Sequence, residues 1–289
     1  MKIMRFIGIV FALFSAGSPS DTSAQDSGKK YKVYMVSNSH LDTQWRWDVK
    51  ATIDDYLYNT AVQNLALLEK YPHYVFNFEG AVKYEWIKEY YPHLFERIRK
   101  FVADGRWNIS GASFEANDPN MPSSESFIRN ILLAQEFYKK EFGIKSKDMF
   151  LPDCFGFSQV MPTLGHHCGL IGFSTQKLSW RTEPLVGDSK TPFPIGLWEG
   201  VDGARIMVAL EPGRYSWNEF PEGDLSANEE LAESARKSPF GIAYRYYGNK
   251  LANGAGDHGG SALPRSIQLL EEGITNGKGP VQLVSATSS

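Results

Sequence analysis

The stretch Tyr31-Lys-Val-Tyr-Met-Val-Ser-Asn-Ser-His-Leu-Asp42 decides the fold class of this chain. Its first part, Tyr31–Ser37, is an apolar run with the length of a buried strand, and His40 and Asp42 follow it closely. Residues two apart in an extended segment point to the same side, so His40 and Asp42 can reach one ion together. A buried strand followed by polar residues is typical of a parallel sheet, which places ligands at the carboxyl ends of its strands.

A second segment, Phe150-Leu-Pro-Asp-Cys-Phe-Gly156, is a short apolar run that stops abruptly at the carboxylate of Asp153. A third carboxylate at the end of another strand would complete most of a metal site that also contains a nucleophile. Imidazole and carboxylate ligands without thiolates favour Zn²⁺, with other divalent cations possible. We therefore predict a metal site made of His40, Asp42 and Asp153.

Strand and helix signals alternate along most of the chain, which predicts βαβ units and an α/β fold with a parallel, barrel-like sheet. The expected strands are Tyr31–Ser37, Tyr74–Phe78, Arg106–Ser110, Met149–Leu151, Ile171–Thr175 and Ile206–Leu210. The expected helices are Thr52–Lys70, Val82–Ala103 with a break at Pro92, one capped by Ser123 and running to Phe142, and one ending at His167. We expect no closing helix or strand before Ser289, and hence an open barrel in a catalytic domain truncated at its C-terminus.

Further polar residues follow other strands of this predicted sheet. Asp118 lies beyond the strand that ends at Ser110, and Lys177 follows the strand that ends at Thr175. Chance seldom places so many polar residues at strand ends, so these two residues belong to the predicted site.

Composition bounds the function. The chain has 289 residues, of which 42% are hydrophobic and 22% charged, which is ordinary for a globular domain. The formal net charge is −3 and no Lys/Arg run stands out, so nothing indicates nucleic acid or an anionic membrane as a partner. Aromatic residues make up 13%, and they either fill a core or line a carbohydrate site. Oligomeric state is not indicated by the sequence.

The N-terminus has the pattern of a signal peptide. Lys2 and Arg5 precede an apolar run, Phe6–Phe14, and small and polar residues follow it up to Ala24. The run is too short to span a bilayer. We expect cleavage after Ala24, with a site near Ala16 or Gly17 as the alternative, and residues 25–289 forming the exported domain, periplasmic or extracellular in a bacterium.

The remaining cysteines and histidines have ordinary explanations. The two Cys residues, at 154 and 168, permit a disulfide on spacing alone, but Cys154 is better explained as a small buried residue. His73 and His93 follow prolines beside helices and are expected at the surface or in packing. His166 and His167 are expected to interact with the last carbonyls of their helix.

Several blocks of the sequence, in the right order from Tyr31 to Gly260, closely resemble glycoside hydrolase family 38, the α-mannosidases. They are SNSHLDTQWRW (37–47), a long block from Glu89 to Asn130, FLPDCFGFSQVMPTLGHHCGL (150–170), FSTQKLSWR (173–181) with FPIGLWEGVDGARI (193–206), and YGNKLANGAGDHGG (247–260), which resembles the bacterial branch.

The resemblance implies roles for individual residues. His40 and Asp42 correspond to two zinc ligands, and Asp153 corresponds to a third ligand that is also the catalytic nucleophile. A retaining glycosidase needs a second carboxyl group as general acid and base, and Asp257 is the candidate. The contacts to substrate are expected from a second set of residues: Trp45, Trp47 and Trp180 as walls of the sugar pocket, Lys177, and Asp118, which is also the second candidate for the acid.

The resemblance also implies a fourth zinc ligand, a His expected beyond Ser289; His258 is a substitute without a physical reason to prefer it. The leading hypothesis is thus an exported, zinc-dependent, retaining exo-α-mannosidase that acts on mannose-rich glycans. Two alternatives stay open. One is a metal-dependent carbohydrate deacetylase, because a His-x-Asp on a strand also suits hydrolytic metal sites. The other is a non-catalytic glycan-binding remnant.

Overall fold

A computed structural model of the chain describes residues 30–179, 191–251, 254–255 and 257–289. The predicted signal peptide, residues 1–24, lies outside this part. The strands are β1 (Tyr31–Asn38), β2 (Phe76–Glu79), β3 (Trp107–Ser110), β4 (Asp148–Phe150), β5 (Gly172–Ser174), β6 (Ile195–Glu199), β7 (Arg205–Ala209), β8 (Ile242–Gly248), β9 (Lys250–Leu251), β10 (Gly254–Ala255) and β11 (Val281–Ser285). The α-helices are α1 (Val49–Ala51), α2 (Tyr58–Lys70), α3 (Ala81–Tyr90), α4 (Pro92–Ala103), α5 (Ser124–Phe142), α6 (Met161–His167), α7 (Glu229–Arg236) and α8 (Pro264–Asn276).

Short irregular helices complete the fold: a π-helix η1 (Thr52–Leu57) and the 3₁₀ turns η2 (Lys177–Ser179) and η3 (Leu225–Ala227). Helix termini follow the expected signals. Ser123 caps α5 by accepting a hydrogen bond from Ser126 N at 3.2 Å, and Gly143 ends that helix with a φ of 73°. Pro92 separates α3 from α4 and occupies the first turn of α4, where its missing N–H costs nothing.

Two parallel-type sheets form the centre of the molecule. In the first, β1 pairs in parallel with β8 on one edge, while its other edge is shared by β11 and β2, and β3 follows β2. In the second, β4, β5 and β7 are parallel, and β6 pairs with β7 in the antiparallel direction. The predicted α/β class with a parallel sheet is confirmed.

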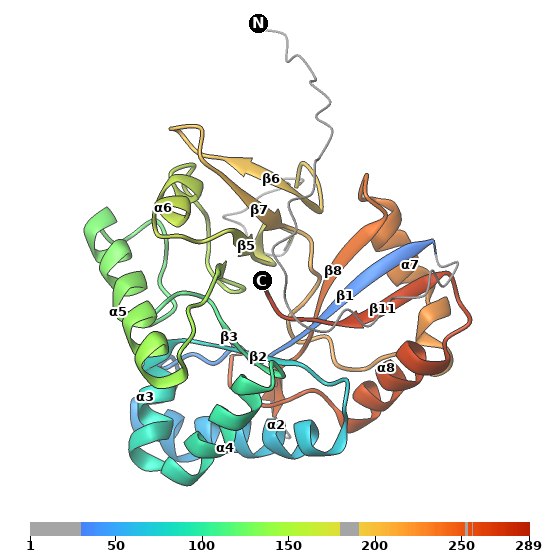
Figure 1. Cartoon of the computed structure of the whole chain (residues 1–289), viewed down its shortest axis with the longest axis horizontal. Helices are drawn as coiled ribbons and strands as arrows, with labels where there is room; N and C mark the ends of the chain where they lie inside the picture. Colours follow the sequence, from blue (N-terminus) through green and yellow to red (C-terminus); the bar gives the residue numbers. More distant parts are fainter. Residues whose placement is uncertain (1–29, 180–190, 252–253, 256) are drawn as a thin grey trace, which may run out of the picture.

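Backbone hydrogen bonds join the two sheets at both seams. Ala112 N, just after β3, donates to Asp148 O of β4 at 2.8 Å, and Tyr246 N of β8 donates to Pro212 O, just after β7, also at 2.8 Å. The parallel strands therefore form a ring, and α2 to α5, α7 and α8 lie outside it (Figure 1). The sequence predicted an open barrel, but these hydrogen bonds join the two sheets at both seams.

The expectation that no helix or strand follows the last motif was wrong. Helix α8 packs Ile267 and Leu270 into the core, and β11 then pairs with β1 from Tyr31↔Val281 to Met35↔Ser285. The alternation in β11, with Val281 and Leu283 buried and the residue between them half-buried, is a strand pattern too short to stand out in the sequence. Strands β6 and β8 and helix α7 were not predicted either.

Each sheet has its own apolar cluster, and α5 contributes to both. Phe127 and Ile131 in the first half of α5 pack with Met149 and Phe173 of the second sheet. Ala134 and Tyr138 in its second half belong to the large cluster around β1, β2 and β3. Within the part of the chain that the structure describes, no helix is long and apolar enough to cross a membrane.

Candidate metal and catalytic site

His40 is the central side chain of the site. It lies two residues beyond β1 and is only 4% exposed. Its Nδ1 lies 2.7 Å from Glu79 Oε1, at the end of β2. Its Nε2 is buried without a hydrogen bond of normal geometry, and it faces Asp42 Oδ1 at 3.2 Å and Asp153 Oδ2 at 3.7 Å. The Nδ1 edge of the ring therefore contacts the buried Glu79, and the Nε2 edge faces the carboxylates of Asp42 and Asp153.

Asp153 follows β4 and Lys177 follows β5, so neighbouring strands of the second sheet bring them together. The Lys177 ammonium forms an ion pair with Asp153 Oδ1, and it lies 4.4 Å from the centre of the Phe155 ring. Lys177 is 2% exposed, whereas the Asp153 side chain is 15% exposed. Asp153 thus keeps one edge accessible while a buried cation favours its ionised form.

Backbone pairing holds Asp257 against the same corner. Asp42 N donates to Asp257 O at 2.9 Å, Gly259 N donates to His40 O at 3.0 Å, and Leu41 forms an antiparallel bridge with His258. Asp257 has a φ of 56°, which is uncommon for a residue other than glycine. Such strained backbone is frequent at functional sites. The Tyr215 hydroxyl donates a short hydrogen bond to Asp257 Oδ1.

The donor set fits a divalent cation. One ligand atom each from His40, Asp42 and Asp257 lies within 4.8 Å of the others, and Asp153 approaches from the opposite loop. The sequence predicted His40, Asp42 and Asp153 as the ligands, and the family resemblance implied Asp257 as the acid; the structure brings these residues together. These roles are not tested by the geometry alone and stay predictions.

Charge at the site points the same way. Burial opposes protonation of His40, but its interactions with the Asp42 and Glu79 carboxylates outweigh burial and raise its pKa to about 9. The imidazole therefore lies in a field that favours a positive charge beside Nε2. A bound cation would supply that charge in place of a proton.

The remaining predicted site residues differ in exposure and in what they contact. Trp45 is 54% exposed and lies edge-on to Trp47. The Trp47 ring is covered by the His258 ring at 4.3 Å, and its Nε1 donates to Thr52 Oγ1 at 2.7 Å, so Trp47 supports the Asp257 loop in addition to any sugar contact. Asp118 is exposed after β3 and accepts a hydrogen bond from Asn120 N at 2.9 Å. Trp180 lies outside the described residues.

The other His and Cys residues follow most of their expectations. His73 lies at the surface and pairs with Glu271, and His93 is exposed. His167 does end α6, but its Nε2 pairs with Asp202 at 2.8 Å and not with a helix carbonyl. Both cysteines are free, and Cys154 is buried as expected.

Sequence reasoning missed Glu79, Lys83 and Tyr215. Glu79 directly follows the expected strand Tyr74–Phe78 and is the last residue of β2. The same signal, a carboxylate at the end of a strand, could therefore have identified it. Lys83 is fully buried with its ammonium 3.7 Å from Glu79. Tyr215 lies in a loop whose sequence carries no local signal, and its ring lies 5.4 Å from that of His40.

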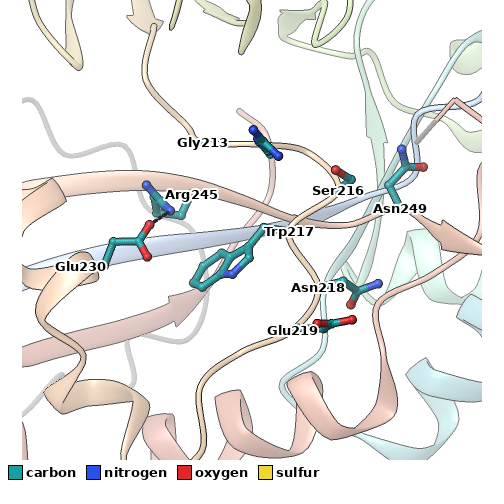
Figure 2. Close-up of a pocket in the computed structure, with 9 residues that line it drawn as sticks. Gly213, Ser216, Trp217, Asn218, Glu219, Glu230, Arg245 and Asn249 are labelled. Atoms are coloured by element: carbon teal, nitrogen blue, oxygen red, sulfur yellow. Dashed lines mark hydrogen bonds and ion pairs between the residues drawn. The ribbon is translucent and has the colours of Figure 1, made fainter. Parts of the chain in front are cut away.

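A pocket of about 550 Å³ lies on the other side of the Tyr215 loop. Trp217, Arg245 and Glu230 line it, with the Arg245 guanidinium 5.2 Å from the Trp217 ring and 2.6 Å from Glu230 (Figure 2). None of the predicted site residues lines this pocket, so the convergent polar groups around His40 define the candidate site better than the cavity does.

Fold and site together define an α/β-barrel domain with an acidic centre at its strand ends, whose imidazole and carboxylate groups fit a cation. The chain belongs to glycosyl hydrolase family 38: the sequence model of the family's N-terminal domain matches residues 30–283. The resemblance of the sequence blocks to this family is thereby confirmed.

Individual proteins agree with this assignment. The chain is 37% identical to alpha-mannosidase G of Dictyostelium discoideum over 66% of its length, and 32% identical to human alpha-mannosidase 2C1 over 89% of its length. It spans only 17% and 23% of those two relatives. Among solved structures, an alpha-mannosidase from Enterococcus faecalis matches with a TM-score of 0.68 over 89% of this chain and 28% of that one; at 22% identity, this likeness supports the fold.

Proposed function

We propose that this chain is the N-terminal catalytic part of an exported, zinc-dependent, retaining exo-α-mannosidase that removes terminal mannose from glycans. Support comes from family membership and from relatives named as alpha-mannosidases. The observation that carries the proposal is the group of carboxylates around His40: Asp42 Oδ1 and Asp153 Oδ2 lie 3.2 Å and 3.7 Å from its Nε2, and Asp257 belongs to the same cluster.

His40, Asp42 and Asp153 would hold the zinc ion, and Asp257 would lie beside it as the acid and base. When bound, the ion acts as a Lewis acid that orients and polarises sugar hydroxyls. The chain's own residues complete the site: Lys177 keeps Asp153 ionised, and Glu79 fixes the ring of His40. Trp45, whose side chain is exposed, would contact the apolar face of a sugar.

In the reaction, an Asp153 carboxylate oxygen forms a bond to the anomeric carbon while the bond to the leaving oxygen breaks, and Asp257 gives that oxygen its proton. Asp257 then takes a proton from water, whose oxygen attacks the anomeric carbon and releases Asp153. The Tyr215 hydroxyl, bonded to Asp257, orients this carboxyl group. This mechanism requires the carboxyl groups of Asp153 and Asp257 to lie about 5–5.5 Å apart when substrate is bound.

The test uses the full-length protein and an aryl α-mannoside. We expect release of the chromophore, loss of release after chelation, recovery with Zn²⁺, and a first product with retained anomeric configuration by NMR. Mannose binding without turnover by zinc-loaded protein would support the glycan-binding remnant instead. Acetate release from acetylated glycans would support the deacetylase, which family membership disfavours.

Export is a separate proposal, supported by the charged, apolar and small-residue regions before Ala24. Mass spectrometry of the secreted protein should find an N-terminus at Gln25. Intact Met1 on active, cell-retained protein would contradict it.

A further inference from the structure

The strongest unexplained feature of the described chain is a buried lysine behind the proposed metal site. Lys83 is 0% exposed, and its ammonium lies 3.7 Å from Glu79 Oε1 and 5.6 Å from the centre of the Phe78 ring. Glu79 is 3% exposed. A buried ammonium is costly unless it is paired, and an ion pair of this kind is often no more stable than apolar residues of the same volume. Packing alone therefore does not explain why these two charges are inside.

The backbone seats the pair directly under His40. Glu79 is the last residue of β2, and Lys83 lies in the first turn of α3. Gly80 between them has a φ of 87°, and a Cβ at this position would lie 3.2 Å from Lys83 Cε. The tight strand-to-helix turn thus folds the lysine side chain back over the carboxylate, which in turn lies 2.7 Å from His40 Nδ1.

This arrangement fixes which nitrogen of His40 faces the carboxylates. An ionised carboxylate only accepts hydrogen bonds, so Nδ1 must carry the proton in its bond to Glu79. Glu79 Oε1 lies 2.7 Å from His40 Nδ1 and 3.7 Å from the Lys83 ammonium, so one carboxylate oxygen joins the two side chains. The Nε2 lone pair of a neutral His40 then points toward Asp42 and Asp153, ready for a cation.

We propose that Glu79 and Lys83 form a positioning pair that presents His40 Nε2 to the metal, with Lys83 balancing the charge of the buried Glu79. The inference rests on the proposed metal site. Glu79 acts on the orientation and basicity of the ligand, as carboxylates behind metal-bound histidines do. Lys83 pairs with the Glu79 carboxylate and acts on His40 through it.

The test measures zinc affinity of the full-length protein by competition with a chromophoric chelator, for the wild type and for Glu79→Gln, Lys83→Met and the double variant. We expect Glu79→Gln to weaken zinc binding by about 10–100-fold. Glu271→Gln is the matched control, because Glu271 pairs with the surface residue His73 as Glu79 pairs with His40. It should leave zinc affinity unchanged.

The double variant separates positioning from a merely structural role. It removes both buried charges, so it should regain the folding stability that Glu79→Gln loses, yet it should still bind zinc about 10–100-fold more weakly than the wild type. Wild-type affinity in the double variant would overturn the inference, and this result holds even if Glu79→Gln alone does not fold. A wild-type protein that binds no zinc would overturn the proposed metal site itself.

Discussion

Two carboxylate–lysine pairs flank His40, one from each sheet, and they are built differently. Glu79 and Lys83 are four residues apart in one strand-to-helix turn, and their side chains are 4% and 0% exposed. Asp153 and Lys177 come from loops after two neighbouring strands, and the Asp153 side chain is 15% exposed. The first pair faces Nδ1 of His40, and Asp153 faces Nε2.

The difference separates support from chemistry. A reacting carboxylate must meet a substrate, so it needs an open edge, and a loop after a strand provides one. A group that only orients a histidine works best where water cannot compete, and a short turn packed under a helix provides that. The comparison predicts that changes at the first sheet affect folding and metal binding, and that changes at the second affect turnover.

The largest effect is expected for Asp153→Asn. The amide keeps the shape of the side chain but removes the proposed nucleophile, so kcat/KM for an aryl α-mannoside should fall by about 10⁴-fold or more. The change also leaves the buried Lys177 ammonium without its carboxylate partner, so the unfolding midpoint should fall as well, and activity is compared at a temperature where the variant is folded. Asp104→Asn, at an exposed helix end, is the matched control and should retain full activity. Near-normal turnover by Asp153→Asn would end the assignment of chemistry to the second sheet.

The two lysines provide the next test. Lys83→Met leaves the buried Glu79 carboxylate without its cation, and we expect a loss of roughly 3–5 kcal/mol in the free energy of unfolding. Lys177→Met should cost less, about 1–3 kcal/mol, because water reaches part of Asp153. Urea unfolding of both variants with zinc removed measures the difference. The reverse order would break the proposed division between support and chemistry.

The sequence was sufficient to predict which residues at the strand ends meet at the candidate site. His40, Asp42, Asp153 and Lys177 all follow strands, and a parallel sheet gathers its strand ends at one edge, so a local pattern carries long-range information. Asp257 came from the family resemblance, since its loop has no strand-end signal of its own.

The supporting part could not be predicted in the same way. Lys83 looks like a solvated helical charge, because its burial depends on how α3 packs on β2 and α5 and not on its neighbours in sequence. Trp47 looks like a sugar platform, but its ring faces His258, more than 200 residues away in sequence. Tyr215 reaches Asp257 only because the loop after β7 folds back over the barrel edge.

Gly259→Ala tests how tightly the first sheet holds the Asp257 loop. Gly259 has a φ of 73°, and an added Cβ would collide with Thr60 Oγ1. The backbone alone should cost roughly 1–2 kcal/mol, and the collision should also displace Asp257 and reduce turnover.

Gly169→Ala is the matched control for this change. Gly169 has a φ of 79° but nothing within 4 Å of the added Cβ, so it carries the same backbone cost without a collision. Measuring unfolding and kcat for both variants isolates the effect of Thr60. Equal kcat values would mean that the loop does not position Asp257.

The smallest effect is expected for Ser123→Ala, which asks whether the two sheets unfold together. Removing the N-cap of α5 should cost about 1 kcal/mol. Because the first half of α5 packs on the second sheet and its second half on the first, both sheets should lose the same hydrogen-exchange protection. Turnover of the aryl α-mannoside should stay unchanged, since the Ser123 hydroxyl bonds to Ser126 and not to a residue of the proposed reaction. Loss of protection in β4, β5 and β7 alone would mean that the sheet carrying Asp153 opens independently, which would make the contrast between the two halves one of stability as well as of chemistry.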